Sequence, residues 1–265
     1  YRDLGHHGGI MCSGFPGDWP PPQVYAVQHG KGVNGFRSRL TGDWVSGPVT
    51  LTEEELAANR RDFYTDVRDH KLATDEYWES RKPDFKKIKV PLFSAANWGG
   101  QGLHPRGNFE GFVQSATKDK WLEVHGIEHW THFYTDYGLN LQKKFFGHFL
   151  KGEKTGWDKQ PRVHLQIRHP GETFVERFEE AWPIPRTTWT KFYLHAEDNS
   201  LTTSPQKKKA EVTYAGLGEG VTFITPPLEA DTEVTGPIAA KLWVSSATKD
   251  ADLFLVVRVF SAEMN

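Results

Sequence analysis

A short segment rich in histidine holds the residue best placed to do chemistry. Residues 120–125 have the mostly apolar pattern of a buried strand, Gly126 follows them, and His129 comes a few residues beyond the strand end. A histidine in such a loop is held by the fold and can still reach a reacting group, as a general base must. His129 could instead pack against Trp130 or cap the next helix. The local pattern leaves both interpretations open.

The same segment also suggests a metal site. His125, His129 and His132 have the spacing i, i+4, i+7, which would put three imidazoles on one face of a helix. Gly126 and the strand before it argue that His125 is not helical, and the His-Glu-x-x-His order of zinc proteases is absent. We therefore expect no metal.

A glycine-rich segment follows the strand expected near residue 90. Gly99, Gly100 and Gly102 do not match the Gly-x-Gly-x-x-Gly fingerprint, and no suitable acid follows about 20 residues later. The phosphate-loop signature is absent as well. We expect these glycines to let the backbone pass close to a side chain, another domain or a substrate. No cofactor is expected.

An acyl-transfer enzyme needs a nucleophile, and the 265 residues contain no Gly-x-Ser-x-Gly elbow. The nearest imitation is Cys12-Ser13-Gly14, but no apolar strand leads into it. Cys12 itself has no activating feature in the sequence around it. As the single cysteine it cannot form an intramolecular disulfide, which favours a reducing compartment, and we expect a cytoplasmic location.

The elements that would position His129 alternate between strand and helix. We predict strands over residues 88–96 and 120–125 and helices over residues 109–116 and 139–150. Gly152 follows as the helix stop. This order is typical of a doubly wound α/β sheet. Two strands joined by one crossover helix are parallel neighbours, so their ends should bring Trp98 and His129 to the same edge of the sheet.

Different patterns flank this region. Thr52 and Glu55 form a capping box at the start of a predicted helix over residues 53–69, and a second short helix is predicted over residues 75–81. Beyond residue 158, short segments that alternate with period two are separated by turns. They predict strands at 163–168, 189–194, 211–214, 221–224 and 240–244, and an apolar run predicts another at 253–260. Short strands at such intervals indicate an all-β sandwich of the jelly-roll kind.

Composition limits the classes of partner. The chain has 32 Lys and Arg against 34 Asp and Glu, a formal net charge of −2. Nucleic acids and anionic membranes need a clustered positive field, so we expect neither as a partner. No apolar run approaches the roughly 20 residues of a membrane-spanning helix. An apolar content of 37% with 13% aromatic residues indicates a folded globular protein rather than a disordered one.

Four segments, taken in order, carry a resemblance to a known family. They are residues 70–81, residues 90–98, residues 126–129, and Trp182–Pro185 together with Phe192–Leu194. The set resembles the cocaine esterase and X-Pro dipeptidyl-peptidase-like serine hydrolases. The resemblance implies an α/β-hydrolase domain with an inserted helical cap, followed by a jelly roll. The α/β plus all-β chain would then divide into a partial hydrolase domain over 1–158, with a cap segment over about 28–87, and an incomplete jelly roll over 159–265.

The resemblance also implies roles for a few residues. His129 corresponds to the histidine of a serine–histidine–acid triad, in which it serves as general base. The family's triad aspartate lies two residues after a strand-end tryptophan, and here that position is Gly100. Because a carboxylate normally orients the imidazole, a substitute is expected. Glu110 or Glu128 could serve, or Gln101 could orient the ring as a neutral partner.

The implied reaction is cleavage of an ester or amide through an acyl-enzyme. The family's serine and oxyanion hole would lie upstream of Tyr1, so we expect the chain to be part of a longer hydrolase and inactive alone. The substrate would be a small ester or amide or a short peptide, and Trp98, Tyr77 and Trp78 would line its pocket or pack in the core. Homo-oligomers are compatible with the sequence. The alternative is a non-catalytic jelly-roll binding module attached to a degenerate hydrolase half.

Overall fold

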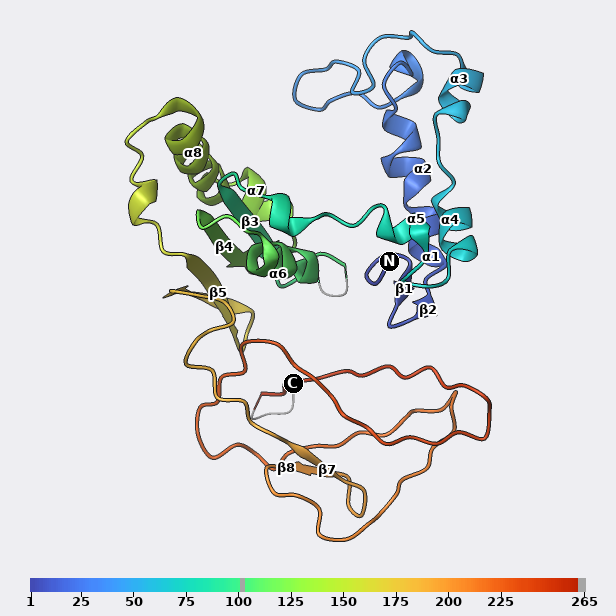
Figure 1. Ribbon diagram of the computed structural model, residues 1–265, viewed down its shortest axis with the longest axis vertical. Coiled ribbons are helices and arrows are strands. Elements are labelled where there is room, and N and C mark those ends of the chain that lie inside the picture. Colours follow the sequence, from blue (N-terminus) through green and yellow to red (C-terminus); the bar gives the residue numbers. More distant parts are fainter. Residues whose placement is uncertain (101–102, 262–265) are drawn as a thin grey trace. The chain divides into compact units, whose positions relative to one another are not determined.

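A computed structural model describes residues 1–100 and 103–261 and divides the chain into two compact units (Figure 1). The first unit spans Tyr1–Gln160 and the second spans Pro161–Asn265. The first contains helices and a pair of parallel strands. The second contains strands and turns, with no helix among its described residues. The chain is therefore an α/β unit followed by a β unit.

The parallel strands of the first unit carry the candidate site at their ends. β3 spans Leu92–Asn97 and β4 spans Lys120–His125, and the two pair in parallel along their full lengths. The helix α6, Pro105–Gln114, connects them and packs on both strands, as Figure 1 shows. The prediction of two neighbouring parallel strands joined by a crossover helix is confirmed.

The ends of β3 and α6 differ from the predicted bounds for reasons tied to proline. β3 starts at Leu92 rather than residue 88, because Pro91 has no N–H to donate. The first hydrogen bond to the segment that leads into β4 is from the Leu92 N–H to the Asp119 carbonyl, at 2.8 Å. α6 starts at Pro105 rather than residue 109. Proline is favoured in the first turn of a helix, where its missing N–H has no intrahelical partner to lose.

Aromatic side chains form the core beside β4. Trp121, Phe145 and Trp157 are buried together, with ring centroids 5.1 to 6.4 Å apart. Phe145 lies on α8, Asp136–Lys151, which covers the helix predicted over 139–150. Gly152 ends this helix in the left-handed conformation, at φ 67°, as the sequence predicts. The short helix α7, Thr131–Tyr134, and the 3-10 turn η4, Trp157–Lys159, complete this part.

Short elements occupy the chain before β3. They are β1 (His6–His7), β2 (Ile10–Met11), α1 (Gly14–Asp18), α2 (Pro20–Gln23), η1 (Tyr25–Val27), η2 (Gly32–Asn34), α3 (Glu53–Ala58), α4 (Phe63–Asp69), α5 (Glu76–Glu79) and η3 (Phe85–Lys87). None of the helices in the described ranges is long and apolar enough to cross a membrane.

The capping box at the start of α3 is confirmed. The Glu55 N–H donates to the Thr52 hydroxyl at 3.2 Å, and the Thr52 N–H donates to the Glu55 carboxylate at 2.8 Å. A single helix over 53–69 is wrong, because the chain forms α3 and α4 with a break between them. Asp62 starts the second helix by accepting the Thr65 N–H at 3.1 Å. An aspartate in this position favours a helix start over a helix interior.

The second unit contains two antiparallel strand pairs. β5 (Val163–His169) pairs with β6 (Thr173–Glu179), and β7 (Tyr193–His195) pairs with β8 (Ser200–Thr202). The strand predicted at 163–168 is confirmed, and only the end of the run at 189–194 lies in a strand.

The strands predicted at 211–214, 221–224, 240–244 and 253–260 are wrong for the described chain, where Ile224 makes only an isolated bridge to Ser200. Alternation sorts side chains onto two faces, but a strand also needs a neighbour for its N–H and C=O groups. β6 is the opposite case: the sequence pattern did not predict a strand there, and the segment forms one because it pairs with β5.

Candidate active site

The backbone ties the end of β3 to the loop after β4. The Trp98 N–H donates to the His125 carbonyl at 3.0 Å, and the Gly99 N–H donates to the Ile127 carbonyl at 2.9 Å. The buried side chain of Asn97 donates its amide N–H to the same Ile127 carbonyl at 3.2 Å. The two loops are therefore held together at the carboxyl edge of the parallel strands, where α/β folds usually place their ligands.

The close contact between these two loops requires glycine at position 99 and places Ile127 in a strained backbone conformation. A Cβ on Gly99 would lie 2.6 Å from the Ile127 carbonyl carbon, so no larger residue fits without moving the loop. Ile127 has φ 49°, a left-handed conformation that a β-branched residue adopts only when its surroundings enforce it. Strain of this kind clusters at functional sites, and here it lies two residues before His129.

His129 is exposed in the loop between β4 and α7. Its ring contacts the Trp130 ring, with centroids 4.7 Å apart, and the His104 ring, with centroids 4.4 Å apart and planes at 63°. His104 precedes α6, so this contact joins the two loops through side chains as well. Burial lowers the pKa of His104 below its usual 6.5, and positive charge on His129 lowers it further.

Gly100, where the resemblance places a triad aspartate, lies beside polar side chains. A Cβ built there would lie 2.8 Å from the Asn97 Oδ1 atom and 3.2 Å from the His104 Cδ2 atom. The position expected for the acid is thus next to an amide and an imidazole. Gln101, the neutral partner considered for His129, lies outside the described residues.

Neither of the two glutamates considered as substitutes makes a hydrogen bond to His129 in the described structure. The Glu110 carboxylate accepts from Gln114 on its own helix. The Glu128 carboxylate accepts from the Thr131 hydroxyl at the start of α7. That hydrogen bond lowers the pKa of Glu128, and positive charge on His132 and His129 lowers it further. Glu128 therefore interacts with His129 through charge.

The three residues predicted to line a pocket lie in two places. Trp98 follows β3 at the candidate site and contacts the Phe109 ring, with centroids 5.9 Å apart. Tyr77 stacks on His70, with centroids 4.3 Å apart, and Trp78 is buried with its indole N–H donating to the His70 carbonyl at 2.6 Å. Trp98 is therefore at the strand edge, whereas the other two are packed among the helices before β3.

His104 is the site residue that the sequence did not single out. A histidine directly before a helix-starting proline is its one local signal, and nothing in the sequence links it to His129. His125, His129 and His132 do not share a helical face, because His125 lies in β4. In the described part of the chain, no group of three or more His, Cys, Asp or Glu side chains is placed to hold a metal ion.

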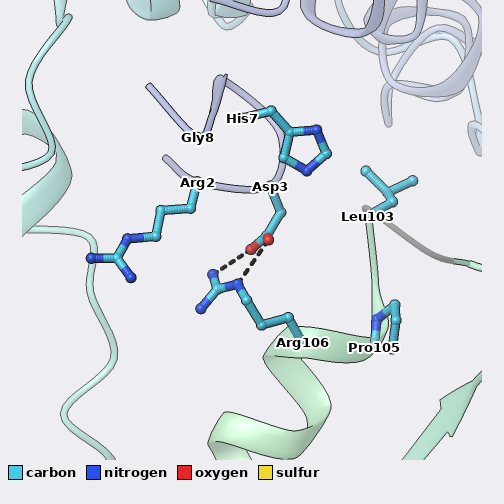
Figure 2. A pocket seen from close by; sticks show the side chains of 7 residues that line it. All are labelled: Arg2, Asp3, His7, Gly8, Leu103, Pro105 and Arg106. Carbon is cyan, nitrogen blue, oxygen red and sulfur yellow. Dashed lines mark hydrogen bonds and ion pairs between the residues drawn. The ribbon is translucent and has the colours of Figure 1, made fainter. Parts of the chain in front are cut away.

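An open depression of about 390 Å³ lies beside the start of α6, as Figure 2 shows. Its lining comes from the first residues of the chain and from the segment after β3: Arg2, Asp3, His7, Gly8, Leu103, Pro105 and Arg106. The Asp3 carboxylate pairs with the Arg106 guanidinium, whose Nε lies 2.8 Å from it, while Arg2 extends away from this pair. The ion pair connects the first residues of the chain to α6.

Comparison with known proteins finds two similarities, each over part of the chain. Residues 155–263 match the X-Pro dipeptidyl-peptidase C-terminal non-catalytic domain. Two crystal structures of a CocE/NonD family hydrolase from Staphylococcus aureus are similar to this chain, with 35% identity over 57% of it and TM-scores of 0.53 and 0.54. These findings support the resemblance to the CocE/NonD and X-Pro dipeptidyl-peptidase-like hydrolases. No curated protein sequence matches the chain.

The relation to the CocE/NonD hydrolases covers only part of those proteins. The chain spans 28% and 27% of the lengths of the two solved CocE/NonD chains. Residues 155–263 correspond to a domain that is described as non-catalytic.

Proposed function

We propose that the protein containing this chain is a serine hydrolase of the CocE/NonD type, which cleaves an ester or amide bond through an acyl-enzyme. The position of His129 carries the proposal. It is exposed at the carboxyl edge of β3 and β4, on a loop tied to the neighbouring loop by the Gly99–Ile127 hydrogen bond. This placement supports an imidazole that is held by the fold and open to a substrate.

In the proposed reaction His129 is the general base. It removes the proton of a serine hydroxyl while the serine oxygen bonds to the substrate carbonyl carbon. It then returns that proton to the leaving alcohol or amine as the carbonyl–leaving-group bond breaks. A water molecule, deprotonated in the same way, cleaves the acyl-enzyme and restores the serine. The serine would come from another part of the hydrolase, since these 265 residues contain no Gly-x-Ser-x-Gly elbow.

Glu128 is the acid that we assign to His129 in place of the aspartate missing at Gly100. It holds a negative charge close enough for His129 to lower its pKa, after the larger effect of the Thr131 hydroxyl. Such a charge stabilises the imidazolium that forms when His129 takes a proton. Glu110, bonded to Gln114, is the weaker assignment.

The substrate that we infer is a small ester or amide or a short peptide, bound at the strand edge beside Trp98. Tyr77 and Trp78 would support the cap rather than line the pocket, because one is stacked on His70 and the other is buried. We place the hydrolase part at 1–158, with the cap at about 28–87, and a jelly roll at 159–265. The match of residues 155–263 to the family's C-terminal domain supports this division.

A non-catalytic role is the second candidate function. The observation that favours it is the site itself, where glycine occupies the position of the triad acid and no described carboxylate is hydrogen-bonded to His129. In this case the β unit would be a binding module carried by a hydrolase half that has lost its chemistry.

The test uses the full-length protein that contains these residues. It should label with a serine-directed fluorophosphonate and hydrolyse small p-nitrophenyl esters. His129→Gln should lower kcat/KM by about 10³-fold or more, as expected for a lost triad member. His169→Gln, a change at an exposed histidine at the end of β5, is the control and should keep wild-type activity. Absence of labelling and turnover in the wild type, or full activity of His129→Gln, would support the non-catalytic role.

A further inference from the structure

A buried cluster of polar side chains lies beneath the His129 loop and has no part in the proposed reaction. Glu123 and His125, both on β4, are only 3% and 6% exposed. The Nδ1 atom of His125 lies 3.0 Å from a carboxylate oxygen of Glu123, and the Tyr137 hydroxyl on α8 donates to the other oxygen at 2.9 Å. A buried carboxylate is costly unless it is paired in this way, so the cluster is a specific arrangement.

His132 on α7 completes the cluster. Its ring lies 5.2 Å from the His125 ring and 5.3 Å from the Tyr137 ring, centroid to centroid. The carboxylate of Glu123 can only accept, so the His125 Nδ1 atom carries the hydrogen and its Nε2 atom is left as an acceptor when the ring is neutral. The His125 Nε2 and His132 Nδ1 atoms are buried and make no hydrogen bond to another described residue.

The cluster includes one residue at each end of the loop that carries His129. His125 is the last residue of β4, and its carbonyl accepts the Trp98 N–H. His132 lies three residues beyond His129, in the first turn of α7. Between these two anchors the loop includes Ile127 in its strained conformation, which persists only where the flanking structure enforces it.

We propose that Glu123 is a positioning residue, which holds the His129 loop in place through His125, His132 and Tyr137, and that acid conditions release this hold. The inference rests on the proposed function for its consequence, since the loop matters to catalysis only if His129 is the base. The hold itself is a property of the chain that can be measured without a substrate.

The pH dependence follows from the groups around His132. Those facing it are Glu123 and His125 from β4, Glu128 from the loop and Tyr137 from α8. Burial lowers the pKa of His132 below 6.5 and charge on His125 lowers it further, while Glu123 and Glu128 oppose this. Because the folded state disfavours protonated His132, the stability of the neutral cluster is complete above pH 6.5 and is lost as pH falls through the folded pKa.

Amide hydrogen exchange of residues 126–135 in the 265-residue chain tests the proposal. Exchange rates are divided by the intrinsic rates at each pH, so that only protection by structure is compared. In the wild type, protection of this segment should be constant from pH 7.5 to about pH 6.5 and should fall as the pH is lowered further, because the pKa of His132 lies below 6.5. His132→Gln should remove most of that pH dependence.

Glu123→Gln should reduce protection of the loop about tenfold at pH 7.5, because it replaces a charge-assisted hydrogen bond in a buried site. Glu54→Gln, at an exposed carboxylate on α3, is the matched control and should leave the loop unchanged. If Glu123→Gln fails to fold by circular dichroism, Tyr137→Phe, which removes one hydroxyl from the same carboxylate, provides the comparison.

Wild-type protection in the folded Glu123 or Tyr137 variant would overturn the positioning role. Protection that does not change with pH in the wild type would overturn the acid release. These outcomes are independent of activity, so they are distinguishable from a failure of His129 to act as a base.

Discussion

The rings of His104 and His129 meet edge to face, with centroids 4.4 Å apart, although one precedes α6 and the other follows β4. This contact adds a side-chain link to the backbone hydrogen bond between Gly99 and Ile127. Two imidazoles so close cannot both be protonated without mutual repulsion. The edge of the sheet therefore combines an exposed histidine, His129, with a second histidine whose pKa it lowers.

The first prediction concerns the ionisation of this histidine pair. The folded pKa of His104 lies below 6.5 because of burial first and of charge on His129 second. At this residue the folded state therefore binds fewer protons than the unfolded state. The contribution of neutral His104 to stability is complete above pH 6.5 and is lost as pH falls through the folded pKa. An NMR titration of the ring protons should show the lowered pKa of His104.

His129→Gln should move the pKa of His104 upward, toward its usual value, because a positive neighbour is removed while the burial remains. An unchanged titration of His104 in this variant would contradict the contact between the two rings.

The second prediction concerns Gly99. Gly99→Ala should lower the free energy of unfolding by about 1–3 kcal/mol, because the new methyl group overlaps the Ile127 carbonyl and forces the loop to shift. Chemical denaturation followed by circular dichroism measures this. Gly107→Ala is the matched control, since a Cβ on this α6 residue meets nothing within 4 Å. The control should be neutral or stabilising by up to about 1 kcal/mol, as alanine favours helix.

The third prediction separates the two candidate acids in the full-length protein. Glu128→Gln should lower kcat by about 10²-fold or more while circular dichroism stays unchanged, because the imidazolium of His129 loses its compensating charge. Glu110→Gln, at a carboxylate bonded to Gln114, should keep wild-type kcat. If both variants keep full activity, the acid assignment made here is wrong and His129 is oriented by another group.

The fourth prediction concerns the start of α3. Thr52→Ala removes the hydroxyl that accepts the Glu55 N–H and should cost about 1 kcal/mol of the free energy of unfolding, a typical value for a lost helix cap. Thr74→Ala, at an exposed threonine between α4 and α5, should have no measurable effect. Equal stabilities of the two variants would mean that the capping box does not stabilise the folded chain.

Some features of this protein could be predicted from neighbouring residues alone. The apolar run at 120–125 predicts β4 at its observed bounds, Thr52 and Glu55 predict the cap of α3, and Gly152 predicts the end of α8. Each depends on interactions within a few residues or on burial that every side chain in the run shares. The parallel pairing of β3 with β4 is also predictable, because one crossover helix permits few other arrangements.

Only part of the candidate site can be predicted from neighbouring residues. Its loop after β4 and His129 are visible in the sequence, because a strand end and a histidine lie close together there. The contact with His104 is not, since a ring contact between two loops depends on how the strands bring them together. The same holds for Glu123, which has the sequence pattern of one polar residue in a buried strand and becomes part of a cluster only when α7 and α8 pack over it.

The strands of the second unit show the same division between sequence and tertiary structure. The sequence by itself determines which residues alternate, and this suffices at 163–168, where β6 supplies the partner for β5. At 211–214 and 221–224 the alternation is equally clear and no strand forms among these described residues. Hydrophobic period is a property of the chain, whereas a strand exists only where another strand accepts and donates its backbone hydrogen bonds, and that is decided by the tertiary structure.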